Sequence, residues 1–74
     1  MEEKLLEIFR GIFTEVDPSE ITLDSEFKEF EQFTSLTQMT IIDEIMNKLN
    51  VKIKLRPFIK AETIEDVLNI ITEE

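Results

Sequence analysis

A chain of 74 residues is long enough for one domain and too short for two. The absence of cysteine and histidine excludes a disulfide framework, a thiolate metal site, the usual zinc ligand and the usual general base. The net charge of −9, from 17 acidic and 8 basic residues, argues against nucleic acid as a partner, because cations must displace the phosphate counterions. It favours partners with basic protein surfaces.

Two further features narrow the class of protein. The single glycine, Gly11, excludes a glycine-rich phosphate-binding loop. No apolar run approaches the ~20 residues that a membrane span requires, and the start Met1-Glu2-Glu3-Lys4 is unlike a signal peptide. We therefore expect one soluble, cytoplasmic domain over residues 1–74, with its natural ends. Its acidity serves either partner binding or solubility alone.

The first predicted element is an amphipathic helix from Glu2 to about Glu15. Apolar residues recur along it at steps of three and four, at Leu5, Phe9, Ile12 and Val16. The Asp17-Pro18 pair ends this helix, because the residue before a proline avoids the helical region.

The connection over residues 17–33 is long for a compact domain and is rich in turn formers. Such a loop is tolerable if its apolar side chains anchor it to the core. The three-residue spacing of Phe27, Phe30 and Phe33 predicts core packing together with one or two helical turns.

The second predicted helix runs from Ser35 to about Asn50, a residue that can end a helix in the left-handed conformation. Its apolar stripe is broad enough for a core face and a partly exposed shoulder, and comprises Leu36, Met39, Ile42, Ile45, Met46 and Leu49. Thr34 can cap the first turn, which places Ser35 at the surface near the positive end of the helix dipole. That end stabilises an attached phosphate. Simple capping, including a Ser35-x-x-Gln38 capping box, is the alternative.

Apolar and polar residues alternate strictly over residues 51–55, a pattern that by itself indicates a strand. Because no second convincing strand is recognisable for pairing, we expect an extended loop. Arg56-Pro57 then turns the chain, and Phe58 and Ile59 form one short helical turn with Pro57 at its first position.

The last predicted helix begins at Thr63, where Asp66, three residues on, completes a variant of the capping box. Its buried stripe comprises Ile64, Val67, Leu68 and Ile71. Together the elements predict an all-α fold. It is a small four-helix bundle of three long helices and one short helix, with a long first loop.

Carboxylates are plentiful, but their spacing does not build a catalytic or metal site. Asp43 and Glu44 project about 100° apart on a helix and do not converge. The Asp17-x-x-Glu20 and Asp24-x-Glu26 pairs lack the glycine and the full ligand series of an EF-hand loop. Ser35 has no histidine to act as its base. We predict that the chain is not an enzyme and has no dedicated metal site. A helical metal-binding protein stays among the hypotheses.

Four short motifs, in register over nearly the whole chain, resemble the acyl carrier protein family. They are Ile21-Thr22-Leu23-Asp24-Ser25-Glu26-Phe27, Phe33-Thr34-Ser35-Leu36, Leu49-Asn50-Val51-Lys52-Ile53 and Thr63-Ile64-Glu65-Asp66-Val67. The first is similar to the loop before the modified serine, and the second to the Asp-Ser-Leu motif. The other two resemble the segment that closes the second helix and the start of the last helix. The size, the acidity and the order of the elements agree with this family.

The resemblance implies that Ser35 receives a 4′-phosphopantetheine arm from coenzyme A through a phosphodiester bond. The terminal thiol of the arm explains how a chain without cysteine could carry acyl or aminoacyl groups as thioesters, sheltered in part between helices. The implied setting is a specialised lipid, polyketide or related pathway. The implied partners are a phosphopantetheinyl transferase and acyl-activating or acyl-transferring enzymes with basic surfaces. We expect a monomer.

One departure from the family bears on the site. Thr34 stands where the family usually has an acid that helps the transferase to hold magnesium, so modification could be slower, need a particular transferase or fail. We expect Leu36 and Met39 to make apolar partner contacts and Asp43 and Glu44 to steer the partner. The alternative roles are core filling for Met39 and a solvated surface for Asp43. The alternative function is a non-modified helical adaptor that binds basic partners through the second helix.

Overall fold

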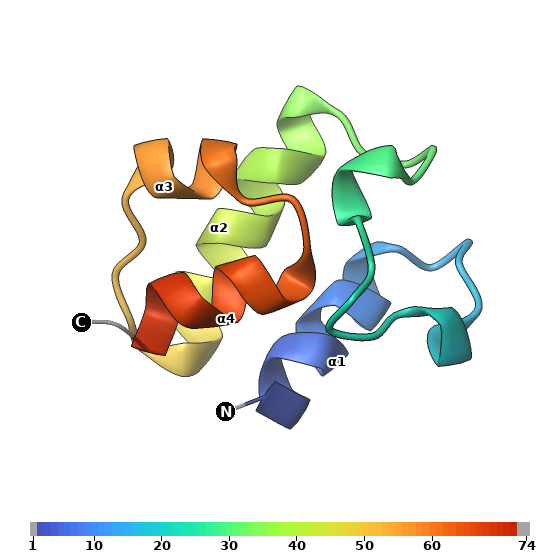
Figure 1. Ribbon diagram of the computed structural model, residues 1–74, viewed down its shortest axis with the longest axis horizontal. Helices are drawn as coiled ribbons and strands as arrows, with labels where there is room; N and C mark the ends of the chain where they lie inside the picture. The colour runs from blue at the N-terminus through green and yellow to red at the C-terminus, as the bar shows by residue number, and fades with distance from the viewer. Residues whose placement is uncertain (1, 73–74) are drawn as a thin grey trace.

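The computed structural model of the protein describes residues 2–72, which contain helices and loops and no strand. The elements are α1 (Glu2–Ile12), η1 (Pro18–Glu20), η2 (Phe27–Glu29), α2 (Ser35–Leu49), α3 (Leu55–Lys60) and α4 (Ile64–Thr72), where η is a 3-10 helix. α1 packs along α2, and α4 contacts both α1 and α3 (Figure 1). The predicted all-α bundle of three long helices and one short helix is confirmed.

Aromatic rings occupy the centre of the bundle. The side chain of Phe27, which comes from the first loop, is fully buried. Its ring centroid lies 5.0 Å from that of Phe9 in α1 and 5.8 Å from that of Phe58 in α3. The other buried residues are Leu5, Leu6, Ile8, Phe13, Ile21, Ile41, Ile42, Ile45, Ala61, Ile64, Val67 and Ile71. Since no polar or charged side chain is buried over residues 2–72, hydrophobic burial dominates the stability of the core.

The first loop is anchored to the bundle, as its apolar residues predict. Phe27 lies in η2, so the helical turn expected from the phenylalanine spacing is confirmed. The short helix η1 was not predicted from the sequence. Asp17 starts it by accepting a hydrogen bond from the Ser19 N–H at 3.0 Å, and Pro18 fills its first position.

Polar contacts complete the anchoring of this loop. The Arg10 side chain of α1 donates from Nε to the Pro18 carbonyl and from Nη2 to the Ile21 carbonyl, each at 3.2 Å. At the other side, the Ile64 and Glu65 N–H groups in the first turn of α4 donate to loop carbonyls. The loop therefore satisfies donors that a helix start leaves open.

The first helix is shorter than predicted. α1 ends at Ile12 rather than near Glu15. The Glu15 N–H donates to Gln32 Oε1 at 2.8 Å instead of continuing the helix, and the Val16 N–H closes a tight turn with the Phe13 carbonyl. A side chain from the distant end of the loop thus decides where the helix stops.

The short third helix begins earlier than predicted. α3 starts at Leu55, so Pro57 is its third residue and not its first. A proline is tolerated there because the first-turn N–H groups have no partner within a helix. The segment before it is extended without strand pairing, as predicted, and it follows Asn50, which adopts the left-handed conformation expected of it (φ 55°, ψ 45°).

The start of α4 is the predicted capping box. Asp66 N–H donates to Thr63 Oγ1 at 3.2 Å, and Thr63 N–H donates to Asp66 Oδ2 at 3.1 Å. The same carboxylate oxygen also accepts from the Glu62 N–H at 2.9 Å. These backbone donors, that of Glu62 foremost, lower the pKa of Asp66 from its ordinary value because they favour the ionised carboxylate.

Candidate functional site

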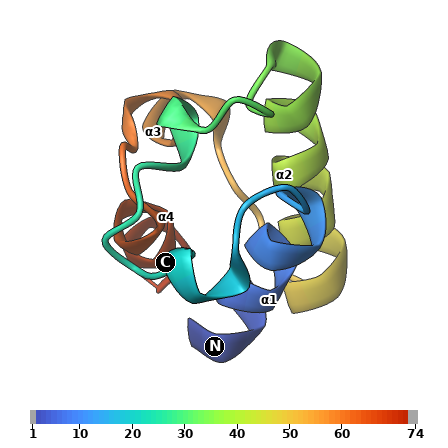
Figure 2. The same ribbon diagram turned by 90° about the vertical axis from the view of Figure 1, so that its right-hand side faces the viewer.

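Ser35 occupies the first position of α2, immediately after the residue that caps the helix. Thr34 has an extended backbone, and its Oγ1 accepts from the Thr37 N–H at 3.2 Å. The predicted Thr34 cap is confirmed, and a capping box based on Ser35 is excluded. The first turn of α2 lies at the periphery of the molecule in both ribbon views (Figures 1 and 2).

The turn that presents Ser35 is held by neighbouring side chains. Thr37 Oγ1 donates to the Gln32 carbonyl at 2.7 Å and lies 3.1 Å from Thr34 Oγ1. The Ser35 side chain is exposed, and within residues 2–72 its hydroxyl takes part in no hydrogen bond. The serine is thus fixed in position while its oxygen stays open to an approaching protein.

The electrostatics of this turn suit an anionic substituent. α1 and α4 both carry acidic residues in their first turns, whereas the first turn of α2 carries none. No acidic side chain in the first turn of α2 therefore neutralises the partial positive charge of this helix end. An exposed phosphate ester at Ser35 would be stabilised there by about 0.3–1 kcal/mol. The residues present fit a phosphate attached to Ser35.

Next to Ser35, one side of α2 presents a mixed apolar and acidic surface. Leu36 is 81% exposed and Met39 is 56% exposed, so a core-filling role for Met39 is excluded. These two residues line a shallow hollow together with Thr40 and Asp43. The opposite side of the helix carries Ile41, Ile42 and Ile45, all buried. The predicted division of the apolar stripe into a core face and an exposed shoulder is confirmed.

Glu44 does not join the surface formed by Leu36, Met39 and Asp43. Its carboxylate pairs with Lys48 Nζ at 3.0 Å, one turn further along the helix. Thr40 takes part in the hollow, because its four-residue spacing from Leu36 places both residues on the same side of α2. The Thr40 hydroxyl donates to the Leu36 carbonyl at 3.0 Å, so this side chain adds mainly its methyl group to the surface.

The side chains whose pKa is displaced lie outside this site. The backbone N–H of Ser19 is the main cause that lowers the pKa of Asp17, and its hydroxyl adds to the effect. Desolvation lowers the pKa of Lys28, whose Nζ donates to the carbonyls of Phe58 and Ile59 at the end of α3. Together with Asp66, these groups hold turns and helix ends in place. Over residues 2–72, no group of three or more acidic residues converges as a metal site.

A family model described as the phosphopantetheine attachment site matches residues 3–71 of the chain. The chain belongs to the phosphopantetheine attachment family. It is therefore a carrier protein that bears a 4′-phosphopantetheine group, and carriers of this family work with a phosphopantetheinyl transferase and acyl-handling enzymes. Searches among curated proteins and among solved structures give no significant match. None of the described helices is long and apolar enough to cross a membrane.

Proposed function

We propose that the protein carries acyl or aminoacyl intermediates as thioesters on a 4′-phosphopantetheine arm attached to Ser35. The observation that supports this most directly is the exposed Ser35 hydroxyl at the first position of α2, in a chain of the attachment family. Attachment would form a bond between Ser35 Oγ and the phosphate of the arm, and the nucleotide part of coenzyme A would leave. The arm supplies the thiol that the sequence lacks.

The helix contributes position and charge rather than catalysis. The Thr34 cap fixes the backbone before Ser35, and the helix end favours the negative charge of the phosphodiester. Because Ser35 stands at the periphery, a long arm attached there can leave the surface and reach separate enzymes. In this proposal the chain is a carrier that presents a bound intermediate and performs no reaction by itself.

The proposed partner surface consists of Thr34, Leu36, Met39, Asp43 and Glu44. Leu36 and Met39 would make the apolar contacts, since both side chains are exposed beside the serine. Asp43 would steer basic partners toward this surface. Glu44 would join after release from Lys48, because an exposed pair of this spacing contributes only about 0.3–0.5 kcal/mol. A cytoplasmic monomer in a specialised lipid, polyketide or related pathway completes the proposal.

Intact-mass measurement tests the attachment site. Incubation of the apo protein with coenzyme A, magnesium and a broad-range transferase should add one phosphopantetheine. Ser35→Ala should abolish the addition, and Ser19→Ala should leave it unchanged because Ser19 lies in η1, away from α2. If several transferases leave the wild type unmodified, or if Ser35→Ala is still modified, the proposal is wrong.

The unusually exposed Leu36 supports one second candidate, an unmodified adaptor that binds basic proteins through α2. This function predicts partner binding that Ser35→Ala leaves intact and Leu36→Asp abolishes. A carrier predicts instead that delivery to acyl-handling enzymes requires the arm on Ser35. The two variants, measured side by side, therefore separate the candidates.

A further inference from the structure

Basic residues are concentrated in one part of this acidic chain. Five of the eight basic residues fall within residues 48–60, and residues 45–61 contain no acid. Lys48 is paired with Glu44 on α2. The other four lie on α3 and on the extended segment that precedes it, and are Lys52, Lys54, Arg56 and Lys60.

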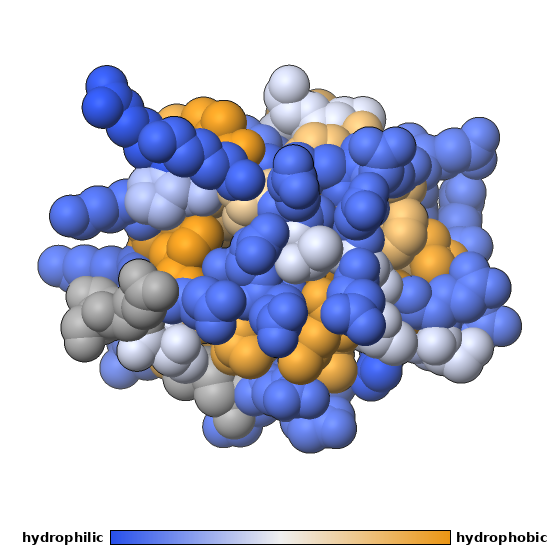
Figure 3. All heavy atoms as spheres, in the orientation of Figure 1, coloured by the Kyte–Doolittle hydropathy of each residue, from blue (hydrophilic) through white to orange (hydrophobic). Residues whose placement is uncertain are grey.

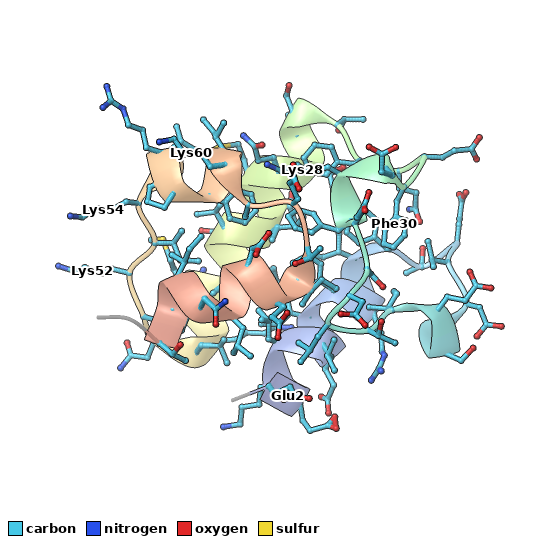
Figure 4. The ribbon with its side chains drawn as sticks, viewed as in Figure 1. Glu2, Lys28, Phe30, Lys52, Lys54 and Lys60 are labelled. Atoms are coloured by element: carbon cyan, nitrogen blue, oxygen red, sulfur yellow. The ribbon has the colours of Figure 1, made fainter. Side chains whose placement is uncertain are left out.

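These four cations are presented at the surface, and their spacing in the sequence explains why. In the extended segment, exposed Lys52 and Lys54 alternate with half-buried Val51 and Ile53, so both lysines project to the same side of the chain. Figure 4 shows Lys52 and Lys54 pointing outward along one edge of the molecule, with Lys60 on α3 beyond them.

Apolar side chains lie among the cations. Leu55 is 49% exposed and Ile59 is 53% exposed, and their four-residue spacing places them on one side of α3. Arg56 and Lys60 have the same spacing and form the adjacent row. Figure 3 shows apolar surface between long hydrophilic side chains over α3. We call this surface the basic–apolar face, defined by Lys52, Lys54, Leu55, Arg56, Ile59 and Lys60.

The helix α3 is anchored to the core beneath it, and the four cations of the basic–apolar face form no ion pair with the acids of residues 2–72. Phe58 is fully buried beneath α3, and Lys28 Nζ donates to the Phe58 and Ile59 carbonyls at 3.1 and 2.6 Å. Over residues 2–72 the one ion pair is that between Lys48 and Glu44, so no carboxylate of this range pairs with the four cations. At one end of the face, Ile59 and Lys60 share a hollow with Glu26, Glu29 and Glu62, so the positive charge is least opposed at Lys52, Lys54 and Arg56.

We propose that the basic–apolar face binds an acidic protein surface with an exposed apolar side chain at its centre. Charge complementarity selects this partner, and Leu55 and Ile59 supply the apolar contact. The whole chain keeps a net charge of −9, so its long-range field repels partners that are strongly acidic overall, such as a nucleic acid or a second copy. The partner we infer therefore carries a small acidic patch and is not strongly acidic as a whole. A six-residue helix with two exposed apolar residues would bury little apolar area in a lipid bilayer, so membrane binding through this face would be weak. The face shares no residue with the surface around Ser35.

The test uses the full chain and a defined probe. The probe is a fluorescent amphipathic helical peptide with glutamates on one side and leucines on the other, and its anisotropy reports binding. A matched peptide with lysines in place of the glutamates is the control for charge. We expect binding of the glutamate peptide alone, backbone amide shifts confined to residues 51–60, and no change in Ser35→Ala.

Charge reversal locates the contact on the chain. Lys52→Glu with Lys54→Glu should weaken peptide binding by roughly tenfold, and Ile59→Ser by roughly fivefold. The control variant, Lys4→Glu with Lys48→Glu, makes the same charge change on α1 and α2, outside the basic–apolar face. It should weaken peptide binding by less than about twofold. All these positions are exposed, and thermal unfolding verifies that each variant folds.

Four results would overturn the proposal. They are equal binding of the lysine peptide, equal weakening by the control reversal, no binding of the glutamate peptide at about 1 mM, and tighter binding to phosphatidylserine vesicles than to the peptide. The last result would assign the face to a membrane surface. Failure of any of these tests leaves the attachment proposal for Ser35 untouched, because that proposal is measured by mass on a different surface.

Discussion

Thr34 is the residue that most directly shapes the surroundings of Ser35. Its hydroxyl accepts the Thr37 N–H and so fixes the backbone immediately before the serine. An aspartate would cap the helix equally well and would add the negative charge that carriers resembling this chain usually have there. The threonine therefore keeps the structural function of the position and lacks its charge.

We predict that Thr34→Asp is modified several-fold faster than the wild type. The added carboxylate would help a transferase to hold magnesium, and beside the positive end of α2 it would also raise the free energy of unfolding by about 0.5 kcal/mol. Initial rates of phosphopantetheine addition by intact mass measure the first effect, and urea unfolding measures the second. Thr34→Asn, which caps without charge, should match the wild-type rate. A rate for Thr34→Asp no faster than that of Thr34→Asn would contradict this explanation.

At the scale of the elements, the helices that start with a capping residue were predictable from the sequence. Thr34 and Thr63 each begin a helix at the expected residue, because the capping bonds are local. The end of α1 was not predictable, since it depends on the Gln32 side chain, which is far along the chain from Glu15. The start of α3 was missed because a proline fits any of the first-turn positions.

The candidate site was predictable to a similar degree. The apolar periodicity of α2 indicated an exposed shoulder with Leu36 and Met39, and both side chains are exposed. The separation of Glu44 from this surface was not evident, because its contact with Lys48 depends on side-chain conformation. Prosthetic-group chemistry could not be derived from the helix end alone. It came from the resemblance and from the family match.

The capping box of α4 makes a prediction about pH. Hydrogen bonds from the Glu62 and Thr63 N–H groups lower the pKa of Asp66 from 3.8, so the ionised carboxylate stabilises the folded state. This contribution is fully present above the unfolded-state pKa and is lost as the pH falls through the lower, folded-state value. The difference in free energy of unfolding between the wild type and Asp66→Asn should therefore be constant from pH 7 to about pH 5 and shrink below about pH 4. Urea unfolding at each pH measures it, and a difference that grows on acidification would contradict the prediction.

At the scale of the whole molecule, a small core must hold together a strongly charged chain. A domain of this size buries a modest fraction of its surface, and its net charge of −9 adds self-repulsion in the folded state. Only one ion pair, Lys48 with Glu44, is present over residues 2–72. Most acidic side chains are therefore solvated and repel one another through water, where added salt screens them.

We predict that salt stabilises this protein through screening of its acidic surface. Between about 20 mM and about 300 mM NaCl, the free energy of unfolding should rise by about 1 kcal/mol, because the Debye length falls below the distances between the exposed acids. Urea unfolding at neutral pH measures the rise.

A variant with Glu7→Gln, Glu15→Gln and Glu31→Gln alters exposed acids outside the helix caps and lowers the magnitude of the net charge by three. It should be more stable than the wild type at low salt and less sensitive to NaCl. If both proteins showed the same salt dependence, the prediction would be wrong. The effect of NaCl would then come from stronger burial of apolar surface and not from screening of charge repulsion.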